Sequence, residues 1–498
     1  MVTRVRSTLE AGGVTELHED RFFDPDPTTR SYAREIYEGT RELPIVSPHG
    51  HVDATVLASN EPFSDPASLI VTSDHYIVRL LYSRFVSLDV LGVQPREESA
   101  AKVETDPRRI WQKFAEHWHL FRATPTRAWI DYELHEVFGV KEELDGTSAS
   151  KIYDAIAERL QSPEFKPREL LKRFRIEFLA TTNGAADSLQ SHATLRQAKL
   201  DARIVPTFRP DALLAISAPG WDSELKRFAT AAETEIRAYG DFIAAIRKRR
   251  EEFKRAGAKA TDHAVVTPHT ERMVDADIER MFARALEGKA SRHDQSRFEA
   301  HMLMEMAALS AEDGLVMQLH AGALRNHNEF LFKHYGPDRG GDIPVATEFT
   351  RNLRQLLNAY GNDTRFRLIV FTLDESAYSR ELAPIAGHYP AVLLGAPWWF
   401  HDSIEGMMRF RRETTETAGI DNTAGFTDDT RAFCSIPARH DLARRVDANY
   451  LAGLVARHII DLSEARGMAF LMAYDLAKRA YRLTDQPKTN DSTQTVTT

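Results

Sequence analysis

The chain has 498 residues, of which 43% are hydrophobic and 28% are charged, and its formal net charge at pH 7 is −9. Such a composition predicts a globular protein with a large core and room for more than one domain. The acidic balance and the lack of a long basic run argue against a nucleic-acid partner, because phosphate binding needs clustered Lys and Arg.

Cysteine content and hydropathy give expectations about the compartment. The one cysteine, Cys434, cannot form an intramolecular disulfide, which is typical of a reducing compartment. The N-terminal residues contain no apolar core of signal-peptide length, and no window has the roughly 18 apolar residues of a membrane span. We therefore expect a cytoplasmic protein with no membrane partner; whether it forms a homo-oligomer is left open.

Short β-branched or aliphatic runs recur along the chain and end in polar residues. They lie at residues 43–47, 176–182, 202–207, 258–261, 314–320, 367–373, 391–395 and 423–427, of which the fourth and the eighth have the weakest strand pattern. Most are followed by helical patterns, for example at residues 186–199, 275–286, 298–310 and 405–417. Strands that alternate with helices predict parallel pairing, and eight such units predict an α/β fold, a (β/α)8 TIM-type barrel.

A long segment rich in helix formers and aromatic residues separates the first two predicted strands. It is too long for an ordinary connection in a barrel, so we interpret residues 55–172 as a helical insertion. Residues 1–54 then hold an N-terminal segment with the first strand, and residues 173–485 hold the rest of the barrel. Residues 486–498 are polar and predict a disordered tail.

The sharpest motif is His49-Gly50-His51, directly after the first predicted strand. Strand geometry directs alternate side chains to one face, and neutral imidazole is a good ligand for zinc. Asp429 ends the predicted eighth strand, which neighbours the first strand in a closed barrel. The histidine pair by itself is weak evidence for a metal site, and Asp429 by itself could cap a helix. Taken together, the two histidines and Asp429 predict one bound divalent ion, best matched by zinc.

Other predicted strands also end in polar residues. Arginines among them suggest an anionic substrate, because a guanidinium can hold a carboxylate through two hydrogen bonds. Any one of these residues could instead be structural, but their shared position at strand ends favours a common site. The set comprises Arg209, Asp262, His263, His320, Asp374 and Arg431.

Several motifs in order resemble the uronate isomerase (glucuronate isomerase) family of the amidohydrolase superfamily. The resemblance runs from about Leu17 to Leu483 and departs from the family pattern at Gly50, Val52, Thr430 and Leu373-Asp374-Glu375. The motifs are PHGHVD, Ser73-Asp74-His75-Tyr76, Thr181-Thr182, PTFRPD, Leu319 to Ala323 with Arg325-Asn326, Trp398-Trp399-Phe400, Asp429-Thr430-Arg431 and the tract from Ser435 to Arg445.

This resemblance implies interconversion of D-glucuronate with D-fructuronate and of D-galacturonate with D-tagaturonate. The chemistry expected is metal-assisted proton transfer through an enediol. Carried over by motif, the metal ligands are His49, His51 and Asp429. The catalytic residues are Asp429, His75, Tyr76 and Arg431, and the substrate-binding residues are Arg209, Asp262, His320, Trp398 and Arg431.

Other interpretations stay open at this point. His75 and Tyr76 could simply cap and pack a helix of the insertion, and Trp398 could belong to the core. A metal-dependent hydrolase is the main alternative, although such enzymes often use a carboxylated lysine at a mid-barrel strand end and Lys259 lies within the predicted fourth strand. A catalytically silent sugar-acid-binding barrel is a third possibility. The loop from Asp374 to Arg380 has no assigned role.

Overall fold

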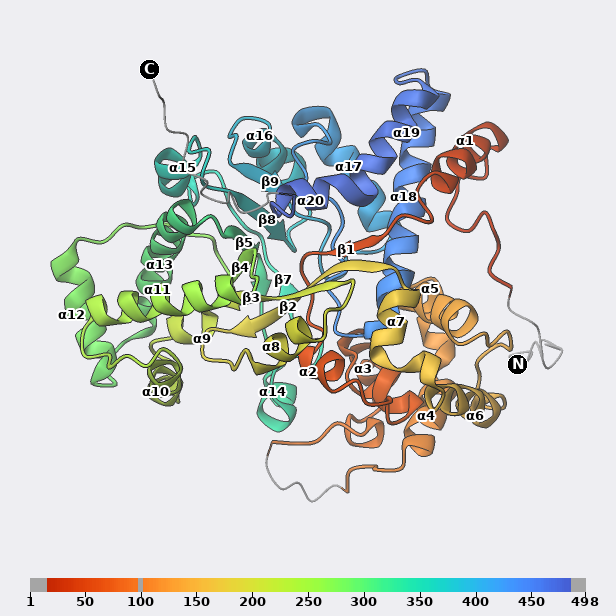
Figure 1. Ribbon diagram of the computed structural model, residues 1–498, viewed down its shortest axis with the longest axis horizontal. Helices are drawn as coiled ribbons and strands as arrows, with labels where there is room; N and C mark the ends of the chain where they lie inside the picture. Colours follow the sequence, from red (N-terminus) through yellow and green to blue (C-terminus); the bar gives the residue numbers. More distant parts are fainter. Residues whose placement is uncertain (1–15, 97–101, 485–498) are drawn as a thin grey trace, which may run out of the picture.

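A seven-stranded parallel sheet curls through the centre of the chain (Figure 1). The computed structural model describes residues 16–96 and 102–484, so the predicted tail at residues 486–498 lies outside the described residues. The strand order is β1-β2-β3-β4-β5-β8-β9, and β6 pairs with β7 in a separate hairpin. The strands are β1 (Ile45–Ser47), β2 (Ile176–Gly184), β3 (Arg203–Arg209), β4 (Ala260–Val265), β5 (Val316–Ala321), β6 (Ala323–Leu324), β7 (Ile343–Pro344), β8 (Leu368–Thr372) and β9 (Val392–Leu394).

The connections between successive strands contain helices, which allows the strands to run parallel. The central strands are buried on both faces. Every residue of β5 and of β8 is buried. Such fully buried strands are typical of sheets that helices enclose. The predicted barrel class is therefore confirmed, with one exception at the eighth strand.

Residues 423–427 form a single parallel bridge, Leu394 to Thr423, instead of the predicted strand. Gly425 explains part of this departure: its φ is +76°, and a Cβ there would lie 2.8 Å from the backbone nitrogen of Ala477. The segment then bends towards β1, and the His51 N–H donates to the Thr430 carbonyl at 2.9 Å. This contact joins the two ends of the curved sheet directly beside the candidate site.

The predicted fourth strand was placed too early in the chain. In the structure β4 starts at Ala260 and includes Asp262 and His263, which the sequence pattern put beyond the strand end. Their polarity hid the strand, since a charged residue at a buried strand position is rare unless it has partners. Asp262 is 1% exposed and lies opposite Gln318 of β5.

Helices fill the chain between β1 and β2. They pack around a buried aromatic group, Trp111, Phe114, Trp118 and Phe121, and lie at the lower right of Figure 1. The elements are α2 (Ala54–Ser59), η1 (Ala67–Thr72), α3 (His75–Tyr82), η2 (Asp89–Leu91), α4 (Pro107–Glu116), η3 (Trp118–Phe121), α5 (Pro125–Tyr132), η4 (Glu133–Val137), α6 (Ala149–Leu160), η5 (Pro163–Phe165) and α7 (Pro167–Arg173).

Of the remaining helices, most lie outside the sheet, whereas α14 packs against the helices between β1 and β2; α12 coincides with the predicted helix at residues 275–286. They are α8 (Gln190–Gln197), α9 (Asp211–Leu214), α10 (Trp221–Ala231), α11 (Tyr239–Arg255), α12 (Asp275–Leu286), α13 (Arg292–Asp313), α14 (Glu329–Tyr335), α15 (Arg354–Tyr360), η6 (Tyr378–Leu382), α16 (Ala383–Ala386) and α17 (Ile404–Ala418).

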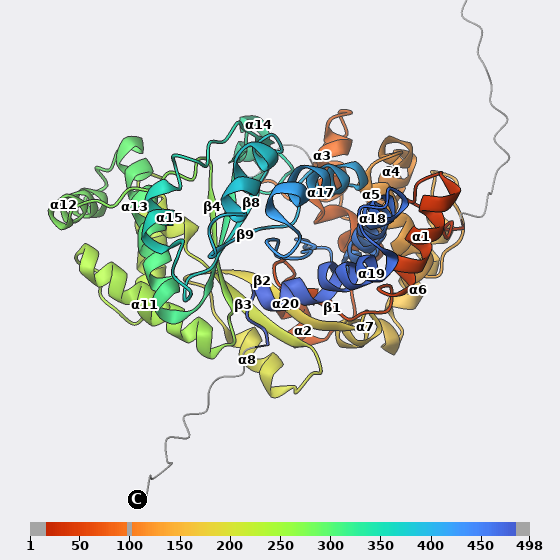
Figure 2. The same cartoon turned by 90° about the horizontal axis from the view of Figure 1, so that it is seen from above.

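The C-terminal helices connect the barrel to both the insertion and the N-terminal helix. The elements are α1 (Pro27–Glu38), η7 (Phe433–Ser435), α18 (Ile436–Ala456), α19 (Leu462–Phe470), η8 (Leu471–Asp475) and α20 (Leu476–Ala480). Helix α18 is buried over most of its length and packs against both α1 and α5 (Figure 2). It follows directly after the segment that carries Asp429, so it fixes that segment against the insertion.

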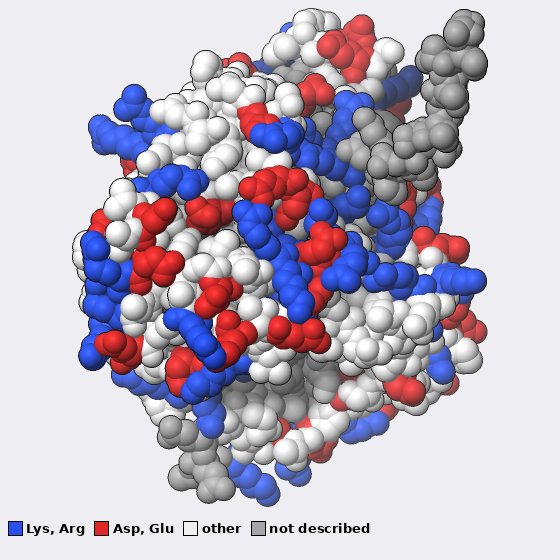
Figure 3. Space-filling model, turned by 60° about the vertical axis from the view of Figure 1, so that its left-hand side comes forward, with Lys and Arg blue, Asp and Glu red and all other residues white. Residues whose placement is uncertain are grey.

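Two surface properties bear on possible partners. None of the helices within residues 16–96 and 102–484 is both long and apolar enough to cross a membrane. On the face seen in Figure 3, basic and acidic side chains are interspersed, and no broad field of one sign covers it. That face has no continuous basic track for a polyanion.

Candidate active site

A cavity of about 270 Å³ lies at the carboxyl ends of the strands, where barrel enzymes hold their substrates. Every residue to which the sequence assigned a metal, catalytic or substrate-binding role lines it. The lining residues are His49, His51, His75, Tyr76, Arg209, Asp262, His320, Arg325, Asp338, Gly340, Asp342, Pro397, Trp398, Trp399, Asp402, Thr427, Asp428, Asp429 and Arg431.

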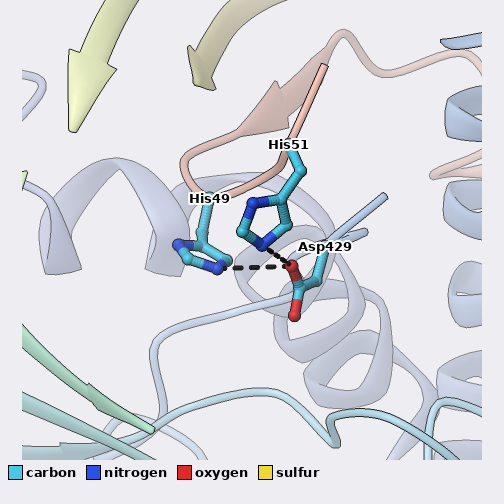
Figure 4. A group of neighbouring side chains, drawn as sticks. All are labelled: His49, His51 and Asp429. Carbon is cyan, nitrogen blue, oxygen red and sulfur yellow. Dashed lines mark ion pairs between the residues drawn. The ribbon is translucent and has the colours of Figure 1, made fainter. Parts of the chain in front are cut away.

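Two imidazoles and one carboxylate converge at the bottom of this cavity (Figure 4). His49 Nε2 lies 3.3 Å and His51 Nε2 lies 3.0 Å from the same oxygen, Asp429 Oδ1. The histidines come from the loop after β1, and Asp429 comes from the segment that closes the sheet. Asp429 has a φ of 41°, a left-handed conformation that Asp tolerates better than most residues and that is common at functional sites.

These three side chains fit a divalent cation. Their ligand atoms all lie within 4.8 Å of one another, and among the described residues the buried Asp429 Oδ1 has no polar partner beyond its ion-pair contacts with His49 and His51. A buried carboxylate oxygen left in this way is costly unless it is neutralised. Burial alone would raise the pKa of Asp429, but His49 and His51 outweigh it and hold the pKa well below its ordinary value. The carboxylate is therefore charged and available as a ligand.

Beside this group, His320 and Asp262 form a buried pair. His320 Nδ1 lies 2.8 Å from Asp262 Oδ1. The other carboxylate oxygen, Asp262 Oδ2, lies 3.3 Å from Arg209 Nη1. Burial lowers the pKa of His320, whereas Arg209 and His320 outweigh burial and hold the pKa of Asp262 well below its usual range. His320 is thus a neutral imidazole whose Nδ1 donates to Asp262, and its Nε2 meets no hydrogen-bond partner in the described part of the chain.

Aromatic rings fix the orientation of His320. Its ring stacks on Phe371 at 4.3 Å between centroids and on His49 at 4.7 Å, and Trp398 meets it edge-on at 4.8 Å. With Nδ1 held by Asp262, these contacts leave one orientation for the free Nε2 nitrogen. The Asp–His pair therefore has the geometry of an oriented general base or hydrogen-bond acceptor.

The insertion contributes His75 and Tyr76 from the first turn of α3. Asp74 caps this helix, accepting the Tyr76 N–H at 2.7 Å, while His75 and Tyr76 both line the cavity. Asp74 thus provides the cap, while His75 and Tyr76 are positioned to reach a bound molecule. The Tyr76 hydroxyl lies 2.7 Å from each carboxylate oxygen of Asp402.

Arg431 lies at the mouth of the cavity. Its guanidinium is 3.4 Å from Asp338, in the long segment between β5 and β8. Burial and the nearby Arg431 lower the pKa of His75 well below its ordinary value, so this imidazole is neutral. Arg209 lies on the opposite side, where Asp211 and Asp262 keep it charged despite its burial. The guanidinium groups of two arginines, Arg209 and Arg431, therefore line one small cavity.

Some residues singled out from the sequence lie elsewhere. His263 bonds to Thr261 within β4, at 2.9 Å, and does not line the cavity. Asp374 accepts from the Thr347 N–H at 2.7 Å, so that side chain anchors a loop. Lys259 precedes β4, and its Nζ lies 3.4 Å from the Arg482 carbonyl, away from the cavity. The lysine expected of the hydrolase alternative is therefore not among the lining residues.

Sequence reasoning assigned no role to Asp402. This carboxylate accepts hydrogen bonds from Tyr76 and, at 2.9 Å, from Arg439 Nη1. Arg439 also lies over the Trp129 ring at 3.6 Å from its centroid. Asp402 follows the Trp398-Trp399-Phe400 motif by two residues, and Arg439 belongs to the C-terminal tract of the resemblance, so proximity to a motif was the available signal.

The fold and the site together define a barrel enzyme with a two-histidine, one-aspartate group that could hold a metal ion. The family model for glucuronate isomerase matches residues 20–478. The chain therefore belongs to the glucuronate isomerase family, and the resemblance stated from its motifs is confirmed.

Individual relatives agree with this family assignment. A uronate isomerase from Nostoc punctiforme is 51% identical over 468 residues, which are 94% of this chain and 98% of the relative. The crystal structure of glucuronate isomerase from Caulobacter crescentus has a TM-score of 0.92 at 46% identity and covers 95% of this chain and 98% of that one. A uronate isomerase structure from Thermotoga maritima has a TM-score of 0.87 at 28% identity and covers 94% and 100%.

Proposed function

We propose that this protein is an aldose–ketose isomerase of hexuronates, which interconverts D-glucuronate with D-fructuronate and D-galacturonate with D-tagaturonate. The observation that carries the proposal is one small cavity that combines the His49, His51 and Asp429 group with the His320–Asp262 pair and two arginines. Family membership at about half identity over nearly the whole chain supports it. A small-molecule substrate in the cytoplasm is part of this proposal.

Arg209 and Arg431 hold the anionic and oxygen-rich ends of the substrate. A guanidinium gives two parallel hydrogen bonds to a carboxylate, which fixes its orientation as well as its charge. Because Arg431 pairs with Asp338 across 3.4 Å in a partly exposed contact, a substrate carboxylate can take the place of Asp338 at small cost. Trp398 packs against the sugar from the side of the cavity that His320 occupies.

One divalent ion, best matched by zinc, is held by His49, His51 and Asp429 in this proposal. When bound, such an ion would act as a Lewis acid that stabilises negative charge developing on a substrate oxygen. The ligand set leaves coordination positions open, as catalytic zinc sites do.

The side chains of the cavity then move two protons. Asp429 takes the proton from C2 and returns it to C1, while the free Nε2 of His320 relays the proton between the oxygens of the enediol. Asp262 supports that step, because its negative charge stabilises the imidazolium that forms. Arg209 and His75 donate to the oxygens on which charge develops.

Tyr76 belongs to this site through Asp402. Its hydroxyl donates to Asp402, while the Phe400 N–H donates to the same hydroxyl at 3.4 Å. The phenol is therefore fixed at the cavity wall. It forms part of the cavity wall on the side of the insertion and limits how much bulk water reaches the enediol, while the proton held on Asp429 can still exchange.

Product identification by NMR tests the proposal. Purified protein is incubated separately with D-glucuronate and D-galacturonate, and the expected products are the two ketoses at equilibrium with their aldoses. A matched variant, His320→Asn, should retain the fold but lose most turnover, because asparagine cannot relay a proton. Failure of both sugars to convert, with the metal bound, would overturn the proposal; hydrolysis of an ester or amide substrate instead would favour the hydrolase alternative.

A further inference from the structure

A second cavity, of about 610 Å³, is lined by residues at and just before the amino ends of β1 and β2, opposite the active-site end of those strands. Its walls come from α1, α18, η4, the end of α7 and the segments that lead into the two strands. Seven arginines and five carboxylates line it, which is an excess of positive charge in a chain whose net charge is negative. The arginines are Arg21, Arg34, Arg41, Arg173, Arg175, Arg444 and Arg445.

Most of these arginines have carboxylate partners. Asp441 accepts from Arg21 at 2.6 Å and from Arg445 at 3.0 Å, and its other oxygen accepts from the Tyr37 hydroxyl. The remaining three paired arginines, Arg34, Arg41 and Arg175, lie against Asp20, Glu38 and Glu42. Asp441 is thus shared by two guanidinium groups, and the carboxylates do not balance the positive charge of the arginines that line the cavity.

Arg444 and Arg173 have no carboxylate within 4.0 Å among residues 16–96 and 102–484. Arg444 is 7% exposed; its Nη1 and Nη2 donate to the Arg41 and Pro44 carbonyls, and its Nε has no hydrogen-bond partner. Arg173 donates to the carbonyls of Glu136 and Val137. Burial lowers the pKa of Arg444 to about 10, so it still carries its charge at neutral pH.

A purely structural role explains only part of this arrangement. The two carbonyl contacts of Arg444 tether the chain before β1, but neutral donors serve carbonyls equally well. A charged group that is buried without a counter-charge is costly, and proteins normally pair it or bind a ligand with it. Here the carboxylate that acts on Arg444 from a distance, Asp441, is already paired with Arg21 and Arg445, and the cavity beside Arg444 is open with a polar wall.

We propose that this cavity is a binding site for a compact dianion of metabolite size, a phosphate monoester or a dicarboxylate. Arg444 is buried and Arg173 is exposed, and both line the cavity, so both guanidiniums can donate to an anion bound in it. The aromatic rings of Tyr132 and Phe174 form apolar walls for the body of the molecule. This site is separate from the uronate cavity, with which it shares no lining residue.

Titration calorimetry on the metal-loaded full chain, at constant ionic strength, tests this proposal with inorganic phosphate, glycerol phosphate and succinate as probes. The double variant Arg173→Met with Arg444→Met should bind the preferred probe about tenfold or more weakly. Arg431→Met, in the active site, should leave that binding unchanged, and so should Arg457→Met, an exposed arginine outside the cavity. Uronate turnover in the double variant shows that it has folded.

The single variant Arg173→Met gives an independent measurement, because this exposed side chain can be replaced without disturbing the core. It should weaken binding several-fold. A stronger response to phosphate and glycerol phosphate than to succinate identifies a phosphate ligand, and the reverse identifies a dicarboxylate. The proposal is wrong if no probe binds at millimolar concentration, or if Arg431→Met abolishes binding while the cavity variants do not.

Discussion

The Tyr76 hydroxyl lies 2.7 Å from each carboxylate oxygen of Asp402, and both side chains line the active-site cavity. Asp402 is 7% exposed and also accepts from Arg439, which lies over the Trp129 ring. A residue of the barrel thus connects two helices of the insertion to the site. Burial and the charge of Asp402 raise the pKa of Tyr76 well above its ordinary value, so the phenol keeps its proton.

Asp402→Asn tests whether this contact positions Tyr76. The amide keeps one acceptor oxygen but loses the negative charge, which weakens the hydrogen bonds from Tyr76 and Arg439. We therefore expect kcat to fall about tenfold to a hundredfold with a smaller change in KM. Tyr76→Phe should have a similar effect. The double variant should be no slower than the slower single variant, because both changes remove one interaction. Fully additive losses in kcat would show that Asp402 acts by another route.

Metal content should depend on the histidines after β1. His49→Ala combined with His51→Ala removes both nitrogen ligands, so the ion measured by mass spectrometry should fall well below one per chain. His119→Ala, an exposed histidine in η3 of the insertion, serves as the control and should retain the metal. Unchanged stoichiometry in the double variant, with a folded circular-dichroism spectrum, would contradict the ligand assignment.

Substitution of lysine for Arg209 or Arg431 separates charge from geometry. Lysine keeps the positive charge but cannot form the two-bond fork, so kcat/KM on hexuronates should fall about tenfold to 150-fold for each variant. Arg412→Lys, on the exposed side of α17, should match the unaltered protein. If both active-site lysine variants had ordinary kcat/KM, the arginines would have no role in substrate orientation.

The sequence predicted the site better than it predicted the strands. His49 and His51 follow a clear strand, and strand geometry alone predicted that they share a face. Asp429 required the closure of the barrel, yet the closing segment has one bridge instead of a strand, because Gly425 bends it against Ala477. The position of Asp429 therefore depends on tertiary contacts such as the His51–Thr430 hydrogen bond, which no local pattern encodes.

Residues that act through partners were the hardest to find. Asp402 is separated from Tyr76 by 326 positions, and neither residue lies on a predicted strand end. Asp262 was found as a polar residue just after a predicted strand, but its pairing with His320 needed the register of β4 against β5. The sequence shows that these polar residues are present, but it does not show which of them form hydrogen bonds with one another in the folded chain.

Glu133 gives a pH-dependent contribution to stability outside the active site. Burial raises its pKa to about 8, an effect that Asp74 reinforces and that Ser435 and Arg439 oppose. The unfolded chain releases this proton near pH 4.5 while the folded chain keeps it, so this contribution falls as pH rises from about 4.5 to 8 and is constant above that. Folding thus loses a few kcal/mol across this window, at about 1.4 kcal/mol per pKa unit.

Glu133→Gln removes this titration. The variant should equal the unaltered protein near pH 5 and become more stable than it by pH 9, measured by urea unfolding across the range. Glu136→Gln, on the exposed side of the same short helix, provides the control and should follow the unaltered protein throughout. A stability difference that does not change between pH 5 and pH 9 would show that Glu133 is ionised in the folded state or that its burial is relieved.

Isomerisation should proceed by proton transfer instead of a hydride shift. A hydride shift needs a metal clamp on both substrate oxygens, usually built from several carboxylates and two ions, whereas this cavity combines two histidines and one aspartate with acid–base groups. A proton held on Asp429 can exchange with water before it reaches C1, but a migrating hydride cannot.

Deuterium at C2 of glucuronate should therefore wash out over many turnovers in ordinary water, as followed by NMR. His320→Asn, given longer incubation to reach equal conversion, shows whether the loss follows turnover. Quantitative retention of deuterium at C1 of the ketose would contradict the proton route.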